Sequence, residues 1–172
     1  GPFPCGTRDN DPLAYAYDDL GNLVEVDVFA DPATAFGTDY VYLGHDAPAG
    51  FEHNLIEVIG ADGRASLEVQ YGLDTDPWSF NRVLAQRSLD GHYAYEYGPA
   101  DSVDDLSVSG LLALPQTSTT VTYPSGHRVE HAFNAQGNVV RRREQLGIPG
   151  GGPEDLTSLY DYNGEGLLIR EQ

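Results

Sequence analysis

The sequence predicts an all-β protein made of antiparallel β-hairpins that repeat along the chain. Three observations support this prediction: apolar and polar residues alternate in several segments, Tyr, Val, Thr and Phe are frequent, and glycine turns recur at similar spacings. A period of two places alternate side chains on opposite faces of a strand, and β-branched and aromatic residues suit such a half-buried surface. No segment of useful length has the period of an amphipathic helix.

In chain order, the alternation is clearest in residues 22–28 (NLVEVDV), 64–72 (RASLEVQYG) and 92–98 (HYAYEYG). Three valines share one face of the first segment, and three tyrosines share one face of the last. The opposite faces carry acidic or polar residues such as Glu25 and Glu96. We therefore predict a strand with one buried face in each segment.

Glycine turns of two forms separate the predicted strands. The first form has Asp or Asn after an aromatic residue and Gly three residues later, as in YDDLGNL (17–23), FNAQGNV (133–139) and YNGEGLL (162–168). Asp or Asn caps a type I turn, and the glycine supplies the positive φ of a bulged hairpin. The second form leads from a glycine turn into a strand that ends in an aromatic residue, as in residues 61–72 and 124–134. The predicted turn glycines are Gly21, Gly63, Gly91, Gly126, Gly137 and Gly166.

These turns make the chain an internal repeat. Predicted strand openings at Asn22, Asn54, Asn81, Leu111, Asn138 and Leu167 lie 27 to 32 residues apart. Each repeat is one hairpin, which cannot bury its aromatic face alone and must stack on its neighbours. We predict a single array over residues 1–172 that begins and ends within a repeat. Its repeat core consists of Tyr15, Tyr17, Tyr71, Tyr93, Tyr95, Tyr97, Phe133, Tyr160 and Tyr162. The rings from Tyr93 onward are expected to be largely buried, with Glu68, Glu96 and Glu130 facing solvent.

Several segments together resemble the YD repeats of Rhs proteins, teneurins and the shell-forming components of insecticidal Tc toxins. They are YAYDDLGNLVEV, DGRASLEVQYG, TTVTYPSGHRVEHAFNAQGNVVRR and YDYNGEGLLIRE, and the resemblance covers most of residues 12–172. It implies a β-sheet ribbon that winds as a continuous spiral or tube in an extracellular or cell-surface protein. Insertions at residues 43–53, 74–79 and 99–110 lengthen the spacing, and no autoproteolytic core or toxin domain is recognisable. The toxin delivery of some relatives is therefore not implied.

The charge of the chain limits its partners. Nine Arg, no Lys and 27 acidic residues give a net charge of −18. Without a basic stripe to neutralise phosphates, we expect no nucleic-acid binding and no adhesion to anionic membranes. No apolar run is long enough to span a bilayer, so we expect no membrane insertion. The single cysteine, Cys5, cannot form an internal disulfide.

One segment has the spacing of a zinc motif. HRVEH places His127 and His131 as in H-x-x-E-H. That motif holds zinc on a helix, whereas these residues lie in a predicted strand, in which four residues span about 13 Å. We expect no zinc site there, no other metal centre and no cofactor.

Residues 74–78 (DTDPW) hold two weaker candidates. Asp74 and Asp76 are weak calcium candidates, since calcium needs six or more oxygen ligands and an Asp-Pro pair is typical of an ordinary turn. Trp78 is a weak sugar-stacking candidate because it lies in an insertion, which would make carbohydrate a partner. No Ser/His/Asp or Cys/His arrangement stands out, so we expect no enzymatic activity.

The spacing of the repeat is preserved when the start of the sequence is placed after its end. Tyr160 follows Gln145 by 15 residues, and Tyr15 follows Gln172 by 15 when the start is placed after the end. This predicts either a 172-residue period in a longer chain or separate copies that add head to tail, with Cys5 near the junction. We expect a non-enzymatic extracellular structural protein that self-associates into a fibre or tube. The alternatives are a shell segment of a secreted polymorphic toxin or adhesin, and a carbohydrate-binding module.

Overall fold

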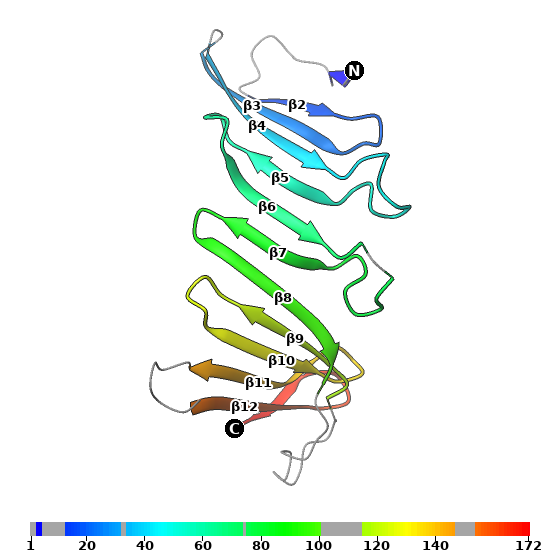
Figure 1. The fold of residues 1–172 in the computed structure, drawn as a ribbon, viewed down its shortest axis with the longest axis vertical. Coiled ribbons are helices and arrows are strands. Elements are labelled where there is room, and N and C mark those ends of the chain that lie inside the picture. Colours follow the sequence, from blue (N-terminus) through cyan, green and yellow to red (C-terminus); the bar gives the residue numbers. More distant parts are fainter. Residues whose placement is uncertain (1–2, 5–12, 32–33, 74, 101–114, 147–153) are drawn as a thin grey trace. The chain divides into compact units, whose positions relative to one another are not determined.

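The computed structural model describes residues 3–4, 13–31, 34–73, 75–100, 115–146 and 154–172. Within these ranges the chain forms β-strands joined by turns and loops, and no helix occurs there (Figure 1). Each defined strand pair is antiparallel and joins strands that are adjacent in the sequence. The predicted all-β fold of antiparallel hairpins is therefore confirmed.

The chain divides into two compact units. Unit 1 comprises residues 1–74 and 81–91, and unit 2 comprises residues 75–80 and 92–172. In unit 1 the strands follow one another across the sheet in chain order, and their connections alternate between its two margins (Figure 1). The strands of unit 1 are β1 (Phe3–Pro4), β2 (Leu13–Tyr17), β3 (Leu23–Asp31), β4 (Thr34–Tyr42), β5 (Leu55–Ile59), β6 (Ala65–Tyr71) and β7 (Val83–Ser88).

Unit 2 is built in the same way. Its strands are β8 (Gly91–Pro99), β9 (Thr117–Thr122), β10 (Arg128–Phe133), β11 (Val139–Leu146), β12 (Glu154–Tyr162) and β13 (Leu168–Glu171). They also follow chain order, so that β8 to β12 each pair with the next strand along the sequence. Pairing between strands that are neighbours in the sequence closes small loops, and the longest connection in this unit is residues 100–116.

Strand register sorts the side chains of unit 1 by charge. Glu25 on β3 lies directly opposite Asp39 on β4, and Glu57 on β5 lies opposite Glu68 on β6. Asp27 is two residues from Glu25 and shares its face, because side chains alternate along a strand. These five carboxylates form the acidic face of unit 1. The alternation of residue types in segments 22–28 and 64–72 therefore corresponds to the two faces of the paired strands.

Strand register also separates the side chains of unit 2, with aromatic rings on one face and charged groups on the other. Tyr95 on β8 pairs with Val121 on β9, which pairs with Val129 on β10. Alternation along the strands places Tyr93 and Tyr97 on the same face as Tyr95, and Phe133 on the same face as Val129; pairing through β11 adds Tyr160 on β12. The rings of this aromatic face are Tyr93, Tyr95, Tyr97, Phe133 and Tyr160. The charged face lies opposite and comprises Glu96, Arg128, Glu130, Arg141, Arg143, Asp161 and Arg170.

Five hairpin turns share one backbone scheme. In each, the first residue donates its N–H to the carbonyl four residues later, and the N–H of the intervening glycine donates back to the carbonyl of the first residue. The turns span residues 18–22, 60–64, 123–127, 134–138 and 163–167. All six predicted turn glycines have a φ between 73° and 124°, a region that favours glycine.

The two turn forms differ in the side chain that braces them. In turn 134–138, Asn134 Oδ1 accepts hydrogen bonds from the N–H groups of Gln136 at 3.0 Å and Asn138 at 2.9 Å. Asp18 and Asn163 brace their turns identically. In the second form the acceptor is the third residue, and Asp62 and Ser125 take this role. This difference explains why the sequence shows two turn patterns for one backbone conformation.

A β-bulge marks the aromatic residue at the end of five strands. The register shifts immediately before Tyr17, Tyr42, Tyr71, Phe133 and Tyr162. The residue that follows each turn and precedes the next strand is Asn22, Asn54, Arg82, Asn138 or Leu167. The strand opening predicted at Asn81 is therefore displaced by one residue. Leu111 lies outside the described residues.

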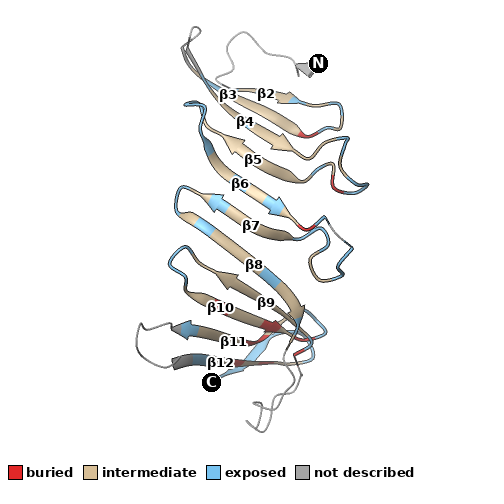
Figure 2. Ribbon diagram, viewed as in Figure 1, coloured by how far each residue is buried: buried red, intermediate tan, exposed pale blue. Residues whose placement is uncertain are grey.

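Burial is shallow on most strands of both units (Figure 2). The enclosed large apolar side chains include Phe51, Val129 and Val140, each 1% exposed. The rings of Tyr93, Tyr95, Tyr97, Phe133, Tyr160 and Tyr162 are half-buried rather than buried. Tyr71 is also half-buried, whereas Tyr15 and Tyr17 are exposed. The expectation of largely buried rings was therefore wrong, because a ring that stands on a sheet needs a covering layer to lose its outer surface to solvent.

Replacement of Gly137 by Ala should lower the free energy of unfolding by about 1–2 kcal/mol, because its φ of 82° forces a β-carbon into a left-handed conformation. Gly164→Ala is the matched control, since Gly164 has no positive φ and an added β-carbon meets no atom within 4 Å. Urea unfolding of both variants measures the difference. Equal stability of the two variants would contradict the turn geometry.

Candidate functional site

Polar side chains link successive connections along one margin of unit 1. His53 Nδ1 donates a hydrogen bond to Asn22 Oδ1 at 2.6 Å, and Asn54 Nδ2 donates to Asn81 Oδ1 at 2.7 Å. These four residues form the polar row. Asn22 is buried and also donates its side-chain amide to Asp18. Because each bond joins two different connections, the row holds neighbouring hairpin ends in register.

The acidic face of unit 1 concentrates negative charge. The pKa of Glu25 is raised above its ordinary value of 4.5, mainly by the charge of Asp27, then by desolvation and by Asp39. Like charges directly opposite each other on neighbouring strands destabilise a sheet. Arg87 lies 3.6 Å from Glu68 and is the basic residue that approaches this face among the described ion pairs.

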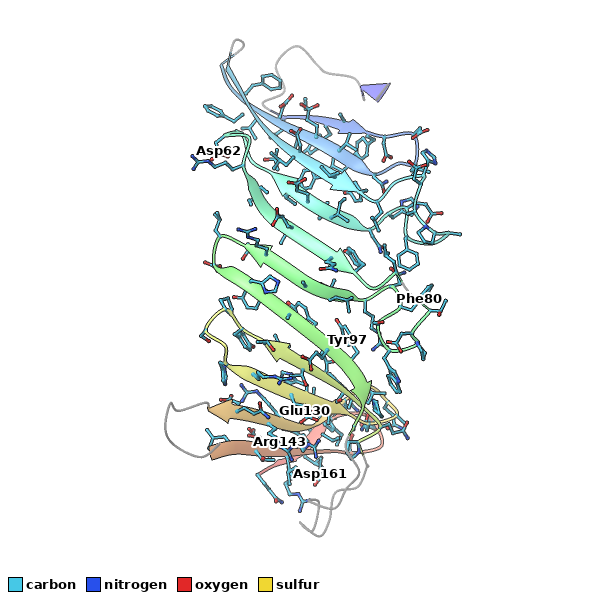
Figure 3. The ribbon with its side chains drawn as sticks, in the orientation of Figure 1. Asp62, Phe80, Tyr97, Glu130, Arg143 and Asp161 are labelled. Carbon is cyan, nitrogen blue, oxygen red and sulfur yellow. The ribbon has the colours of Figure 1, made fainter. Side chains whose placement is uncertain are left out.

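The charged face of unit 2 contains a buried ion pair. Arg141 donates to Glu130 at 2.9 Å, and their side chains are 3% and 16% exposed. Arg143 lies 3.9 Å from the other oxygen of Glu130, and Figure 3 shows Glu130 and Arg143 on neighbouring strands. Nε of Arg141 is buried and has no hydrogen-bond partner among the described residues. The expectation that Glu130 faces solvent was wrong, because it neutralises a buried guanidinium.

A second ion pair lies on the same face, between β12 and β13. Arg170 Nε donates to Asp161 Oδ2 at 2.6 Å, and Asp161 is only 4% exposed. By contrast, Arg128 and Glu96 form a pair at 2.9 Å that is largely open to solvent, and Glu96 and Glu68 are exposed as expected. Sequence reasoning missed the buried pairs because they depend on which residues lie opposite each other, although the run Arg141 to Arg143 after a hairpin turn was a usable signal.

The zinc-like segment lies on β10, as expected, with His127 directly before the strand and His131 within it. Burial and the charge of Arg142 lower the pKa of His131 below its ordinary value of 6.5. His127 stacks on Tyr123, with ring centroids 5.5 Å apart. The described residues contain no group of three or more metal-ligating side chains placed to hold one ion.

The predicted calcium and sugar candidates lie in the connection between β6 and β7. Asp76 accepts hydrogen bonds from the N–H of Ser79 at 3.0 Å and its hydroxyl at 2.8 Å, and the Ser79 side chain is the main cause of its lowered pKa. Its carboxylate therefore braces a turn. Trp78 lies in that turn and is half-buried. Asp74 and Cys5 lie outside the described residues.

The described chain carries exposed apolar side chains on β13, which ends the strand order, and on β2, which pairs with the two-residue strand β1 only at Ala16 and Tyr17. Six of the twelve large apolar residues that are exposed there lie on β2 or in and beside β13. They are Leu13, Tyr15, Tyr17, Leu167, Leu168 and Ile169. Because an unpaired edge with apolar side chains tends to attract another strand, these two strands are the candidate interaction sites.

Comparisons with known proteins add no family to this description. The chain matches no family model, and no curated protein matches it. In the described residues, no helix is both long and apolar enough to cross a bilayer.

Loss of the Glu130 charge should destabilise unit 2 strongly. Glu130→Gln leaves the Arg141 guanidinium buried without its counter-charge, which should cost about 3–5 kcal/mol of unfolding free energy. Glu96→Gln removes an exposed partner of Arg128 and should cost at most about 1 kcal/mol. Urea denaturation of both variants provides the comparison. A Glu130→Gln protein as stable as Glu96→Gln would show that the pair is not buried in solution.

Removal of charge from the acidic face should stabilise unit 1 at neutral pH. Since the folded-state pKa of Glu25 is raised, the stability that this group contributes is fully present below pH 4.5 and is lost as pH rises through the folded pKa. Asp39→Asn removes the opposing charge and should add about 0.2–1 kcal/mol at pH 7, with a smaller gain in acid. Asp46→Asn, an exposed loop change, is the control. Urea unfolding at several pH values tests this, and an equal effect of both changes at pH 7 would contradict it.

Proposed function

We propose that the chain is a non-enzymatic structural module of repeated β-hairpins that adds head to tail to other copies of itself. Pairing between an open strand of one copy and an open strand of the next would extend the sheet into a fibre or tube. The resemblance of the sequence to YD repeats supports an extracellular or cell-surface setting. The observation that carries the proposal is the gathering of exposed apolar side chains on β2 and β13.

The edge of β13 supplies the backbone groups for such pairing. Leu159 and Gln172 exchange both backbone hydrogen bonds, each at 3.1 Å. Since such pairs alternate with outward-pointing ones, the N–H and carbonyl groups of Ile169 and Glu171 point away from β12. No strand of the described residues lies on that side of β13. Ile169 is also 55% exposed, so an added strand would cover both its backbone and its side chain.

The edge of β2 supplies the complementary groups. β1 pairs with Ala16 and Tyr17 only, so residues 13–15 have no strand beyond them in the described chain. Leu13 and Tyr15 place exposed apolar side chains there. Two such strands can form with each other the same backbone hydrogen bonds and side-chain contacts that stabilise the hairpins within one copy.

The internal repeat fixes a register for this contact. Turns 134–138 and 163–167 are equivalent, so Arg170 occupies the place of Arg141, which pairs with Leu159. Tyr162 and Tyr17 occupy equivalent bulges, so Ala14 occupies the place of Leu159. The proposal therefore sets Arg170 opposite Ala14 of the next copy, with Ile169 opposite Tyr15 and Glu171 opposite Leu13. Leu168 would take the place that Pro4 holds opposite Ala16, so β1 has to move aside on assembly.

Sedimentation velocity and electron microscopy over a range of concentrations test the assembly. We expect elongated oligomers that lengthen with concentration. Glu171→Pro removes an outward N–H without breaking a bond to β12, and should raise the concentration needed for assembly by about tenfold. Glu171→Gln keeps the N–H, removes the same charge and should assemble like the wild type.

Two results would overturn the proposal. The wild-type chain would remain monomeric at every concentration, or the Glu171→Pro protein would assemble as readily as the Glu171→Gln protein. The second result would show that copies associate through another surface.

A further inference from the structure

Unit 2 contains a polar cleft between two successive hairpin turns. Turns 134–138 and 163–167 lie on the same margin and are separated by β11 and β12, which places them about 10 Å apart. The cleft between them has a volume of about 580 Å³ and is lined by side chains of both turns and by Tyr162. This volume falls within the range of small-molecule sites.

Four amide side chains line the cleft, and their hydrogen-bonding capacity is only partly used. The Oδ1 atoms of Asn134 and Asn163 each accept two backbone N–H groups within their own turns. Their Nδ2 groups, and the amides of Gln136 and Asn138, make no hydrogen bond to the described residues. Asn134 is only 6% exposed, so its amide is fixed in place while its donor remains unpaired. Donors that are held in place and open to solvent are available to a ligand that supplies acceptors.

The corresponding gap in unit 1 is filled by protein. There the turn 18–22 is followed by the longer connection 43–54 instead of a second short turn. His53 from that connection bonds to Asn22, and His45 lies 3.2 Å from Asp19. The cleft in unit 2 therefore exists because two short turns follow each other with no inserted side chain between them.

The chemistry of the lining selects the class of ligand. Amides donate and accept without charge, and Glu165 is the one ionisable acid that lines the cleft. A net charge of −18 opposes phosphate, sulfate and carboxylate ligands. Tyr162 provides one aromatic ring, which is too little for an apolar ligand but enough to pack on the face of a small ring.

We propose that this cleft binds a neutral sugar through the amides of Asn134, Gln136, Asn138 and Asn163, with the ring of Tyr162 against one face. Hydroxyl groups both donate and accept, so they match side chains that offer both functions. The site is distinct from Trp78. It is also independent of the proposed assembly, since its lining residues belong to two turns of one copy.

NMR titration of the 15N-labelled chain tests the site. The probes are glucose, galactose, mannose and N-acetylglucosamine at millimolar concentrations, with glucuronate and glucose 6-phosphate as anionic counterparts. We expect at least one neutral sugar to shift the side-chain NH₂ signals of Asn134 and Asn163, and the anionic sugars to bind at least tenfold more weakly.

Two variants locate the binding. Gly164→Leu places a side chain into the cleft without backbone strain, since Gly164 has no positive φ and open space at its β-carbon, and should weaken binding at least tenfold. Ala135→Leu makes a similar change at the equivalent place of the other turn, outside the cleft lining, and should leave affinity within twofold. Unchanged backbone spectra confirm that both variants fold. No shift with any neutral sugar, equal effects of the two variants, or shifts centred on Trp78 would overturn the proposal.

Discussion

Backbone pairing between strands that are adjacent in the sequence is the constraint on which both units depend. A strand that pairs only with its predecessor and successor inherits its register from two turns. The recurring turn, with its glycine at positive φ and its braced backbone, therefore determines which residues lie opposite each other. The bulge before the aromatic residue then completes the hairpin, as at Phe133 and Tyr162. The cross-strand pairs within these hairpins, such as Glu57 with Glu68 and Asp161 with Arg170, follow from these local devices.

A sheet whose rings are only half-covered must obtain stability from sources other than a deep core. In unit 2 those sources include the enclosed pair of Arg141 and Glu130 and the buried Asp161 with Arg170. In unit 1 the polar row of Asn22, His53, Asn54 and Asn81 connects successive hairpin ends. The acidic face works against this stability, since its carboxylates repel one another across the strands. Cations that condense on such a face would relieve that repulsion.

Local patterns in the sequence were sufficient to predict the strands in residues 22–28, 64–72 and 92–98, the turn glycines, and which residues share a face within those strands. They predicted burial poorly, because burial depends on what covers a face and alternation reports only which face a residue occupies. Tyr15 has the same pattern as Tyr95 but is 44% exposed on a strand with an open edge. Glu130 shows the opposite error, because it was expected to face solvent but is enclosed beside Arg141. Arg141 lies on the next strand, and the β-bulge shifts the register between the two strands, so the pair is not visible in the sequence of either strand alone. The cleft beside Asn134 was missed because no single segment contains it.

The equivalence of the bulged aromatic positions has a consequence for how such a chain changes over generations. Because each two-strand unit takes its register from its own turn, duplication or loss of a whole unit leaves the sidedness of all other strands unchanged. A gene that encodes this fold can therefore vary in length by unequal recombination without passing through misfolded products. Insertions between Tyr42 and Leu55, or between Tyr71 and Val83, show the same tolerance at the level of single loops.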